Sequence, residues 1–425
     1  MSNLNGLVEV TKKISGFDFF TFFITLLAIS LATLYLLPIL LKLFYHYDDI
    51  YDLVNTYKAS KFLIKLVNLN YKISYICNLL FVQTLKTIFF NYGDNKNSYS
   101  SNIRISLIII YPIKSVGKGL KLQKWVIDKY GLKYDRQFSL AIKNSNTNYY
   151  EALTLKDNVK QSLVEYSLEI DENNLEFFVI SYNSKFFFKI PAIMTNEFIK
   201  QNGGIEVDVD MWGVKSKALN LQFCLPENFK EIIGLPRDCT LLYSSIGHPV
   251  KTCSPKVKKE NNKLDYRYSK FQDYYPLLLL SELDLKNLEQ KLIENNFFDF
   301  KITDYSFRPN LIVDGIDLKP HEEDNWYKFQ MINHKNLKEK HLFRTSTKCA
   351  RCTVPNINFE KDNAKMDKKS PVSKTLSKYR RVDIGSKYNA FFGIYCVNYD
   401  DNFEINVGDY IEVLERKVNI FEDPS

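Results

Sequence analysis

Two cysteines separated by two residues form the most distinctive local pattern in the sequence, Lys348-Cys349-Ala350-Arg351-Cys352. Thiols at this spacing are half of a tetrahedral zinc site, a redox dithiol, or simply two buried side chains. A zinc site would need two more ligands, and a redox motif would need a surrounding βαβ pattern; neither is evident. Because the two basic residues flank the thiols, we expect lowered thiol pKa values, which favour the metal-binding thiolate.

A second group of chemically capable residues follows a very apolar run, in Tyr111-Pro112-Ile113-Lys114-Ser115. Proline fixes φ and interrupts a strand ladder, so we expect Lys114 and Ser115 to leave the sheet at its rim. A cation and a hydroxyl there suit a phosphate or another anion. The ordinary alternative is a strand exit with an exposed lysine.

Two further arginines precede predicted strands. The Asp135-Arg136 dipeptide, taken alone, is typical of a structural ion pair. In Phe307-Arg308-Pro309-Asn310, Arg308 and Asn310 are two positions apart, so we expect both to project toward one side. Guanidinium groups fork onto phosphate, and an amide offers both a donor and an acceptor.

Length and composition limit the class of protein that carries these residues. With 425 residues, 45% hydrophobic and 25% charged, the chain predicts two or three globular domains and excludes fibrous or wholly disordered classes. A net charge of +8 favours an acidic partner or an anionic ligand, and we expect no nucleic acid. Seven dispersed cysteines indicate free thiols in a reducing compartment.

The elements that must position the site are mostly strands. Short β-rich runs outnumber helical patterns after residue 103, which predicts an α+β, β-barrel-rich body. We expect strands at Ile105–Tyr111, Phe138–Ile142, Leu175–Ile180, Lys185–Ile190, Leu311–Val313, Tyr327–Ile332, Phe391–Val397 and Tyr410–Leu414, and helices at Pro226–Ile233 and Leu283–Leu292.

The beginning of the chain contains an uncharged run, Phe19–Leu41, long enough to span ~30 Å of hydrocarbon as a helix. It has no small-residue cleavage site, and a soluble helix seldom lacks a polar stripe, so we expect a membrane anchor rather than a signal peptide or core helix. Lysines after the run indicate that the following part faces the cytosol. Residues 49–102 read either as an amphipathic surface helix or as a linker helix, ending in a polar linker.

Basic residues concentrate in two stretches, 251–270 and 361–381. They are either solvated loops or a docking surface for an acidic protein or an anionic membrane.

Taken in order, the motifs YPIKS, YGLKYDRQF, FRPNLIV, KCARCTVP and TLSKYR…FFGIY…INVGDYI make the chain from about Ile103 to Leu414 resemble MOSC-domain proteins of the mitochondrial amidoxime-reducing component type. The resemblance implies a membrane anchor at 1–48, a linker segment at 49–102, an N-terminal β-barrel domain at 103–195 and a MOSC domain at 196–425. It also implies the mitochondrial outer membrane.

The resemblance further implies a molybdenum cofactor, Mo-molybdopterin, with Cys352 as the metal ligand; a thiolate is a soft ligand that suits such a metal. The residues that it places around the cofactor are cationic or polar: Lys114, Ser115, Arg136, Thr154, Arg308, Asn310 and Arg351. Two departures concern Lys156, where the family commonly has Arg or Gln, and Asn358–Asp362, where a short Asp-Pro turn is usual.

The activity implied by the resemblance is reduction of N-hydroxylated compounds, with electrons from a cytochrome b5-type donor and its reductase. One alternative is cofactor sulfur transfer, although a sulfurase of that kind carries an upstream pyridoxal-phosphate domain that we do not expect here. The other is a non-catalytic, membrane-bound scaffold.

Overall fold

The computed structural model describes residues 103–421 except 184, 212, 245–247, 252–265, 317, 361–362, 384, 387 and 418–420. These residues belong to one compact unit, Asp94–Ser425. The predicted anchor Phe19–Leu41 and the segment 49–102 lie outside the described residues, as does most of the basic stretch 251–270. Among the helices that are described, none combines the length and apolarity that a membrane crossing requires.

The largest sheet has eight strands and carries most of the chain that follows residue 276. Its first strand, β17, also pairs with β1, so the sheet closes into a barrel. In order, the strands are β17 (Leu311–Gly315), β16 (Leu277–Ser281), β22 (Phe391–Asn398), β19 (Lys340–Ala350), β18 (Trp326–Ile332), β24 (Tyr410–Arg416), β1 (Ile103–Ile110) and β3 (Leu120–Leu122).

A second, six-stranded sheet closes in the same manner, because β13 pairs with β6 as well as with β12. Strands on both sides of residue 195 share this sheet, and the predicted boundary there stays a prediction. In order, the strands are β13 (Thr240–Tyr243), β12 (Val214–Asn220), β11 (Ile205–Met211), β7 (Tyr150–Ala152), β6 (Phe138–Lys143) and β2 (Ile113–Lys114).

Smaller sheets complete the β structure. They are β10 (Lys185–Pro191), β9 (Glu176–Tyr182) and β8 (Val164–Ile170); β23 (Phe403–Asn406), β4 (Lys124–Asp128) and β5 (Gly131–Leu132); β14 (His248–Lys251) and β15 (Tyr266–Ser269); and β20 (Ile357–Glu360) and β21 (Asn363–Met366).

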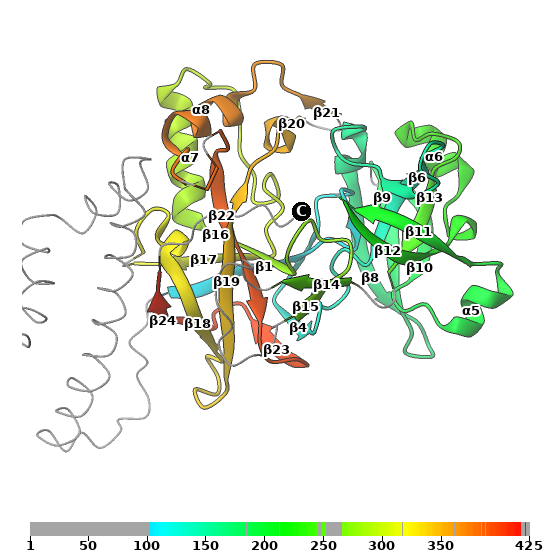
Figure 1. Ribbon diagram of the computed structural model, residues 1–425, viewed down its shortest axis with the longest axis horizontal. Coiled ribbons are helices and arrows are strands. Elements are labelled where there is room, and N and C mark those ends of the chain that lie inside the picture. The colour runs from blue at the N-terminus through cyan, green and yellow to red at the C-terminus, as the bar shows by residue number, and fades with distance from the viewer. Residues whose placement is uncertain are drawn as a thin grey trace, which may run out of the picture. The chain divides into compact units, whose positions relative to one another are not determined.

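The helices are short and have recognisable ends. Ser281 caps the longest, α7, by accepting a hydrogen bond from the Asp284 N–H at 3.0 Å, and Leu288 and Leu292 bury its apolar side. Figure 1 shows α7 and α8 side by side near the eight-stranded sheet, with α5 and α6 near the six-stranded sheet. The helices are α5 (Asn196–Gln201), α6 (Glu227–Ile233), α7 (Glu282–Glu294) and α8 (Pro371–Tyr379), with 3-10 turns η2 (Val159–Leu163), η3 (Gln222–Cys224), η4 (Glu322–Asn325) and η5 (Val354–Asn356).

The expectation of a β-rich α+β body is confirmed, and each of the predicted strands and both predicted helices is present within a few residues of its expected bounds. Short runs rich in β-branched and aromatic residues explain this, and some of these strands, such as β22, are buried along their whole length. One apolar cluster contains Ile105, Phe138, Leu279 and Phe343, which come from both large sheets. The ends of these sheets therefore share one core, and the candidate site forms there.

Candidate functional site

The ring of Tyr111, directly after β1, lies between two guanidinium groups. The Cζ atoms of Arg136 and Arg308 are 4.4 Å and 4.2 Å from its centroid. Burial raises the pKa of Tyr111 above its usual value, so the phenol is neutral at physiological pH. Its Oη is buried and has no hydrogen-bond partner among the described residues. A buried hydroxyl in that state requires a partner that the described part of the chain does not supply.

Arg136 is held rigidly by its own neighbours. Its Nη1 donates to both carboxylate oxygens of Asp135, at 2.9 and 2.7 Å, and to Asn310 Oδ1 at 3.1 Å. Its Nη2 donates to the carbonyl oxygen of Arg308 at 2.9 Å. The same Asp135 carboxylate accepts the N–H of Tyr111 at 2.8 Å. The Asp135–Arg136 ion pair that the dipeptide suggests is present, and it locks Arg136 against the Tyr111 ring.

Arg308 has no such counter-ion. Its Nη1 and Nη2 donate to the carbonyl oxygens of Gly117 and Val116, at 2.7 and 3.0 Å. Among the described residues, no carboxylate forms an ion pair with it. Burial lowers the pKa of Arg308 to about 10, which still leaves the group charged at neutral pH. A partly buried cation without a counter-ion favours binding of an anion at this point.

The backbone around these residues is strained. Ser115, Arg136 and Arg308 have φ values of 58°, 44° and 55°, in the left-handed region that residues with a Cβ seldom adopt. Gly117, at φ 67°, has no room for a side chain, because an added Cβ would lie 2.3 Å from Cε2 of Tyr166. Strain of this kind persists where the surroundings enforce it, and it clusters at functional sites.

The two cysteines of the CxxC differ in exposure. Cys349, the last residue but one of β19, is buried, and Cys352, beyond the strand, is exposed. Arg351 Nη1 donates to Cys349 Sγ at 2.9 Å, and its charge acts on both thiols. The exposed thiol is therefore the one available to a ligand.

The prediction that the flanking cations lower the thiol pKa is wrong for Cys349. Burial raises its pKa and outweighs the opposing charge of Arg351. Lys348, the other flanking cation, is ion-paired with Asp383 at 2.7 Å.

The segment Phe307–Asn310 forms hydrogen bonds with two other predicted site residues, Arg136 and Arg351. The carbonyl of Phe307 accepts Arg351 Nη2 at 2.8 Å, and the carbonyl of Arg308 accepts Arg136. Nε of Arg351 is buried without a hydrogen-bond partner among the described residues, like Tyr111 Oη. Arg136, Arg308, Asn310 and Arg351 are therefore held together although up to 215 positions separate them along the chain.

Three residues lie elsewhere than their motifs suggest. Lys114 is not at an exposed rim: it belongs to β2, is 3% exposed, pairs with Asp273 and donates to the carbonyl of Phe271 at 2.9 Å. Nor do Arg308 and Asn310 project together from a strand, because β17 begins only at Leu311. Asn310 is buried and donates to the carbonyl of Ile109 at 3.3 Å.

Thr154 and Ser115 are half-buried and lie just after β7 and β2 of the six-stranded sheet. The Thr154 hydroxyl bonds to Asp157 at 2.8 Å, and its carbonyl accepts Gln161 Nε2 at 3.4 Å. The Gln161 carbonyl in turn accepts the N–H of Gly117 at 2.8 Å, which leads to Arg308. Thr154 thus reaches the arginine cluster through Gln161.

Sequence reasoning missed the roles of Tyr111 and Asp273. The signal for Tyr111 was its place in the sequence: it follows an apolar run, precedes a proline, and belongs to the same motif as Lys114 and Ser115. No sequence signal pointed to Asp273, because its partner Lys114 lies 159 positions away along the chain.

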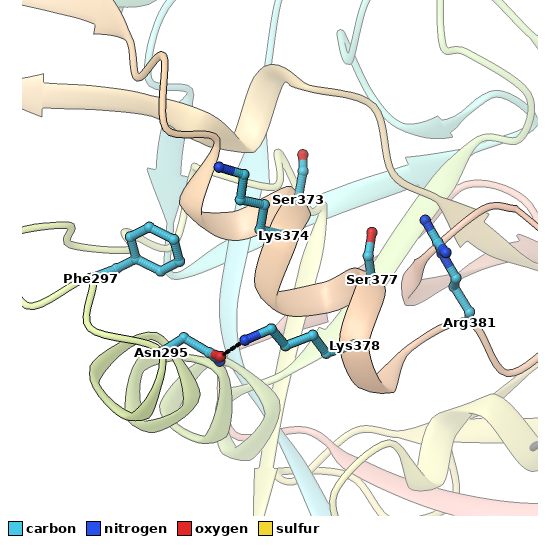
Figure 2. Close-up of a pocket in the computed structure, with 7 residues that line it drawn as sticks. All are labelled: Asn295, Phe297, Ser373, Lys374, Ser377, Lys378 and Arg381. Atoms are coloured by element: carbon cyan, nitrogen blue, oxygen red, sulfur yellow. Dashed lines mark hydrogen bonds between the residues drawn. The ribbon is translucent and has the colours of Figure 1, made fainter.

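A basic hollow of about 400 Å³ lies between the end of α7 and α8. The seven described residues that line it include no acid: Asn295, Phe297, Ser373, Lys374, Ser377, Lys378 and Arg381. Figure 2 shows Lys378 on α8 bonded to Asn295 at the end of α7.

The wall of this basic hollow is bonded to the CxxC segment. Asn356 Nδ2 donates to Ser373 Oγ at 2.7 Å and to the carbonyl of Thr353 at 2.9 Å. Thr353 is the residue next to Cys352. The basic hollow therefore connects to the exposed thiol through a short bonded path.

Comparison with known proteins bears on this arrangement. No curated protein matches the chain. Residues 267–412 match the family model of the MOSC domain, which covers about a third of the chain and includes Arg308, Asn310, Arg351 and Cys352. MOSC domains are associated with proteins that bind the molybdenum cofactor. The exposed thiol of Cys352, with Arg308 and Arg351, therefore lies in the part of the chain that matches a MOSC domain, whereas Arg136 lies outside that part.

Proposed function

We propose that the protein is a molybdenum-cofactor oxidoreductase that reduces N-hydroxylated compounds such as amidoximes. The observation that carries the proposal is an exposed cysteine beside guanidinium groups that lack a counter-ion. Among the described residues, neither Arg308 nor Arg351 forms an ion pair with a carboxylate; Arg351 donates to a thiol and a carbonyl oxygen and lies over the Phe307 ring. An anionic pterin phosphate would supply the missing negative charge.

The residues present fit such a cofactor. Cys352 would ligate the metal, since a thiolate is a soft ligand. Arg308 and Arg351 would hold the anionic part, and the unpartnered Tyr111 Oη and Arg351 Nε offer further hydrogen bonds. Arg136, fixed by Asp135, would orient these groups. When bound, the cofactor supplies the two-electron chemistry by which an N-bound oxygen is removed, and the chain supplies ligation and orientation.

Lys114 and Asn310 are buried and form hydrogen bonds that hold the backbone around the site. Lys114 ties β2 to Phe271, and Asn310 joins β1, β16 and Arg136. We propose that they act on the cofactor through the backbone that they hold, whereas Ser115 and Thr154 face its edge from the six-stranded sheet.

The function is tested on the full chain produced in a host that makes molybdopterin. We expect about one molybdenum per chain by elemental analysis, a pterin by fluorescence, and reduction of an amidoxime by reduced cytochrome b5. Protein from such a host without molybdenum would overturn the proposal. Molybdenum present without reduction would favour the second candidate, cofactor sulfur transfer, which the exposure of Cys352 also permits.

Replacing the unpaired cation gives a more specific prediction. Arg308→Met keeps the volume and removes the charge, so we expect cofactor content to fall about 10-fold or more, as for loss of a charge-assisted hydrogen bond. Lys118→Met is the matched control, because Lys118 is close in sequence to Gly117 but pairs with Glu165 at 3.1 Å near the surface. Equal pterin content in the two variants would contradict the role of Arg308.

We further propose that an acidic, cytochrome b5-type donor, served by its reductase, docks on the basic hollow. The hollow is lined by three cations and, among the described residues, by no acid. Its lining residue Ser373 is hydrogen-bonded to Asn356, which also bonds to Thr353, the residue next to Cys352. A membrane anchor at Phe19–Leu41 would keep the catalytic part on the cytosolic side of the mitochondrial outer membrane.

Reversing one charge in the basic hollow is expected to weaken docking. Lys374→Glu should raise the KM for the reduced donor several-fold and flatten its dependence on salt. The rate with a small artificial reductant should not change. Lys200→Glu on α5 is the charge-matched control; an equal rise in KM in that variant would show a general charge effect and contradict docking at α8.

A further inference from the structure

Three buried side chains converge where α7 begins and η4 turns, away from the arginine cluster. They are Asp284, His321 and Glu323, and a potential ligand atom from each lies within 4.8 Å of the others. Their exposed fractions are 0%, 7% and 0%. The distance from His321 Nδ1 to Asp284 Oδ2 is 3.1 Å. Two carboxyl groups and an imidazole thus share one enclosed space.

The local fold presents these atoms to one another. The backbone N–H of His321 donates to Asp284 Oδ1 at 2.7 Å, which leaves Oδ2 turned toward the imidazole. His321 has φ 60°, and this left-handed turn starts η4 and brings Glu323 to the same place. The rings of Phe392 and Tyr379 lie 5.8 and 5.9 Å from the imidazole and restrict its movement.

The oxygens in this space interact mainly with one another and with the imidazole. Among the described residues, neither Oε of Glu323 nor Oδ2 of Asp284 forms a hydrogen bond of good geometry. The adjacent acid, Asp324, is paired with Arg380, so that cation is already engaged. Burial and the nearby charge of Asp284 raise the pKa of Glu323 well above its usual range. Two fully buried carboxyl groups at this distance require either a proton or a cation between them.

We propose that Asp284, His321 and Glu323 bind a structural zinc ion that ties the start of α7 to η4. One imidazole nitrogen and carboxylate oxygens are common zinc ligands, and zinc is stable with about four donors. Magnesium and calcium prefer six or more oxygen ligands, more than the two carboxyl groups of this cluster supply. The inference is independent of the molybdenum proposal, because it involves none of the residues assigned to that cofactor.

The first test is metal content. Full-length protein is stripped with a chelator, reloaded with zinc chloride, desalted and analysed for zinc, in a Cys352→Ser background that removes the exposed thiol. We expect about one zinc per chain, falling at least five-fold in Glu323→Gln and in Asp284→Asn. Glu322→Gln, one residue away and paired with Arg416, is the matched control and should retain zinc. Equal zinc in Glu323→Gln and Glu322→Gln would overturn the proposal.

The second test is thermal unfolding of the same proteins with and without zinc. Zinc at about 100-fold excess over its Kd should raise the midpoint of the parent protein by roughly 3–4 °C. Without zinc, Glu323→Gln should unfold close to the parent, because the amide has the shape of a protonated carboxyl group. Zinc should then have no effect on it. A parent protein whose midpoint does not respond to zinc would refute the site, even if a variant fails to fold.

Discussion

Replacing Cys352 by alanine is expected to remove molybdenum from the protein and to lower amidoxime reduction by at least about 100-fold. Loss of outer-shell partners of a metal site alone costs 10–100-fold, and loss of the ligand itself should cost no less. The exposed position of Cys352 means that little packing is lost with its thiol. Elemental analysis and the reduction rate, measured on the same preparation, check the prediction.

Cys349→Ala is the matched control. It removes the other thiol of the motif, which is buried against Arg351. We expect this variant to lose some stability through the cavity but to retain molybdenum. If Cys349→Ala lost the metal while Cys352→Ala retained it, the assignment of the ligand would be reversed.

Asp383→Asn is expected to lower the free energy of unfolding by about 3–5 kcal/mol, as removal of one partner from a buried ion pair does. Asp383 and Lys348 are 1% and 2% exposed, and their charged atoms are 2.7 Å apart. Asparagine keeps the size and the oxygen that accepts the N–H groups of Gly385 and Phe421, so the variant isolates the charge. Denaturant unfolding measures the effect.

An exposed pair provides the comparison. Lys124 and Glu404 are 3.1 Å apart with side chains 66% and 43% exposed. Glu404→Gln should change the free energy of unfolding by less than about 1 kcal/mol. If Asp383→Asn and Glu404→Gln lowered the free energy of unfolding by similar amounts, burial would not make the Lys348–Asp383 pair more important for stability, and the prediction would be wrong.

The sequence was informative where a pattern is local. Short β-rich runs bounded by polar clusters located the strands, and the leucine spacing located α7, because each pattern depends on neighbours within one element. The arginines and the CxxC were identified as candidates from their motifs, and the structure brings Arg136, Arg308 and Arg351 together.

The sequence was uninformative where a side chain's partner is remote. Lys114 was expected at an exposed rim, but its partners Phe271 and Asp273 lie more than 150 positions away and draw it inward. Asn310 similarly bonds to Ile109, 201 positions earlier. The thiol pKa of Cys349 was misjudged for a related reason: flanking charges are visible in a sequence, whereas burial, which has the larger effect, is a property of the fold.

Closure of the large barrel has a consequence for biosynthesis. β1 pairs with β17, as in Ile105 opposite Val313, and also touches β24 through Arg104 and Tyr410. The pairing partners of β1, which are β17 and β24, are therefore synthesised some 200 to 300 residues after β1. The nascent chain cannot complete this ring of strands until Tyr410–Arg416 has left the ribosome, and such distant pairings slow folding. A ligand that needs both ends of this barrel can consequently be inserted only after translation has passed that point.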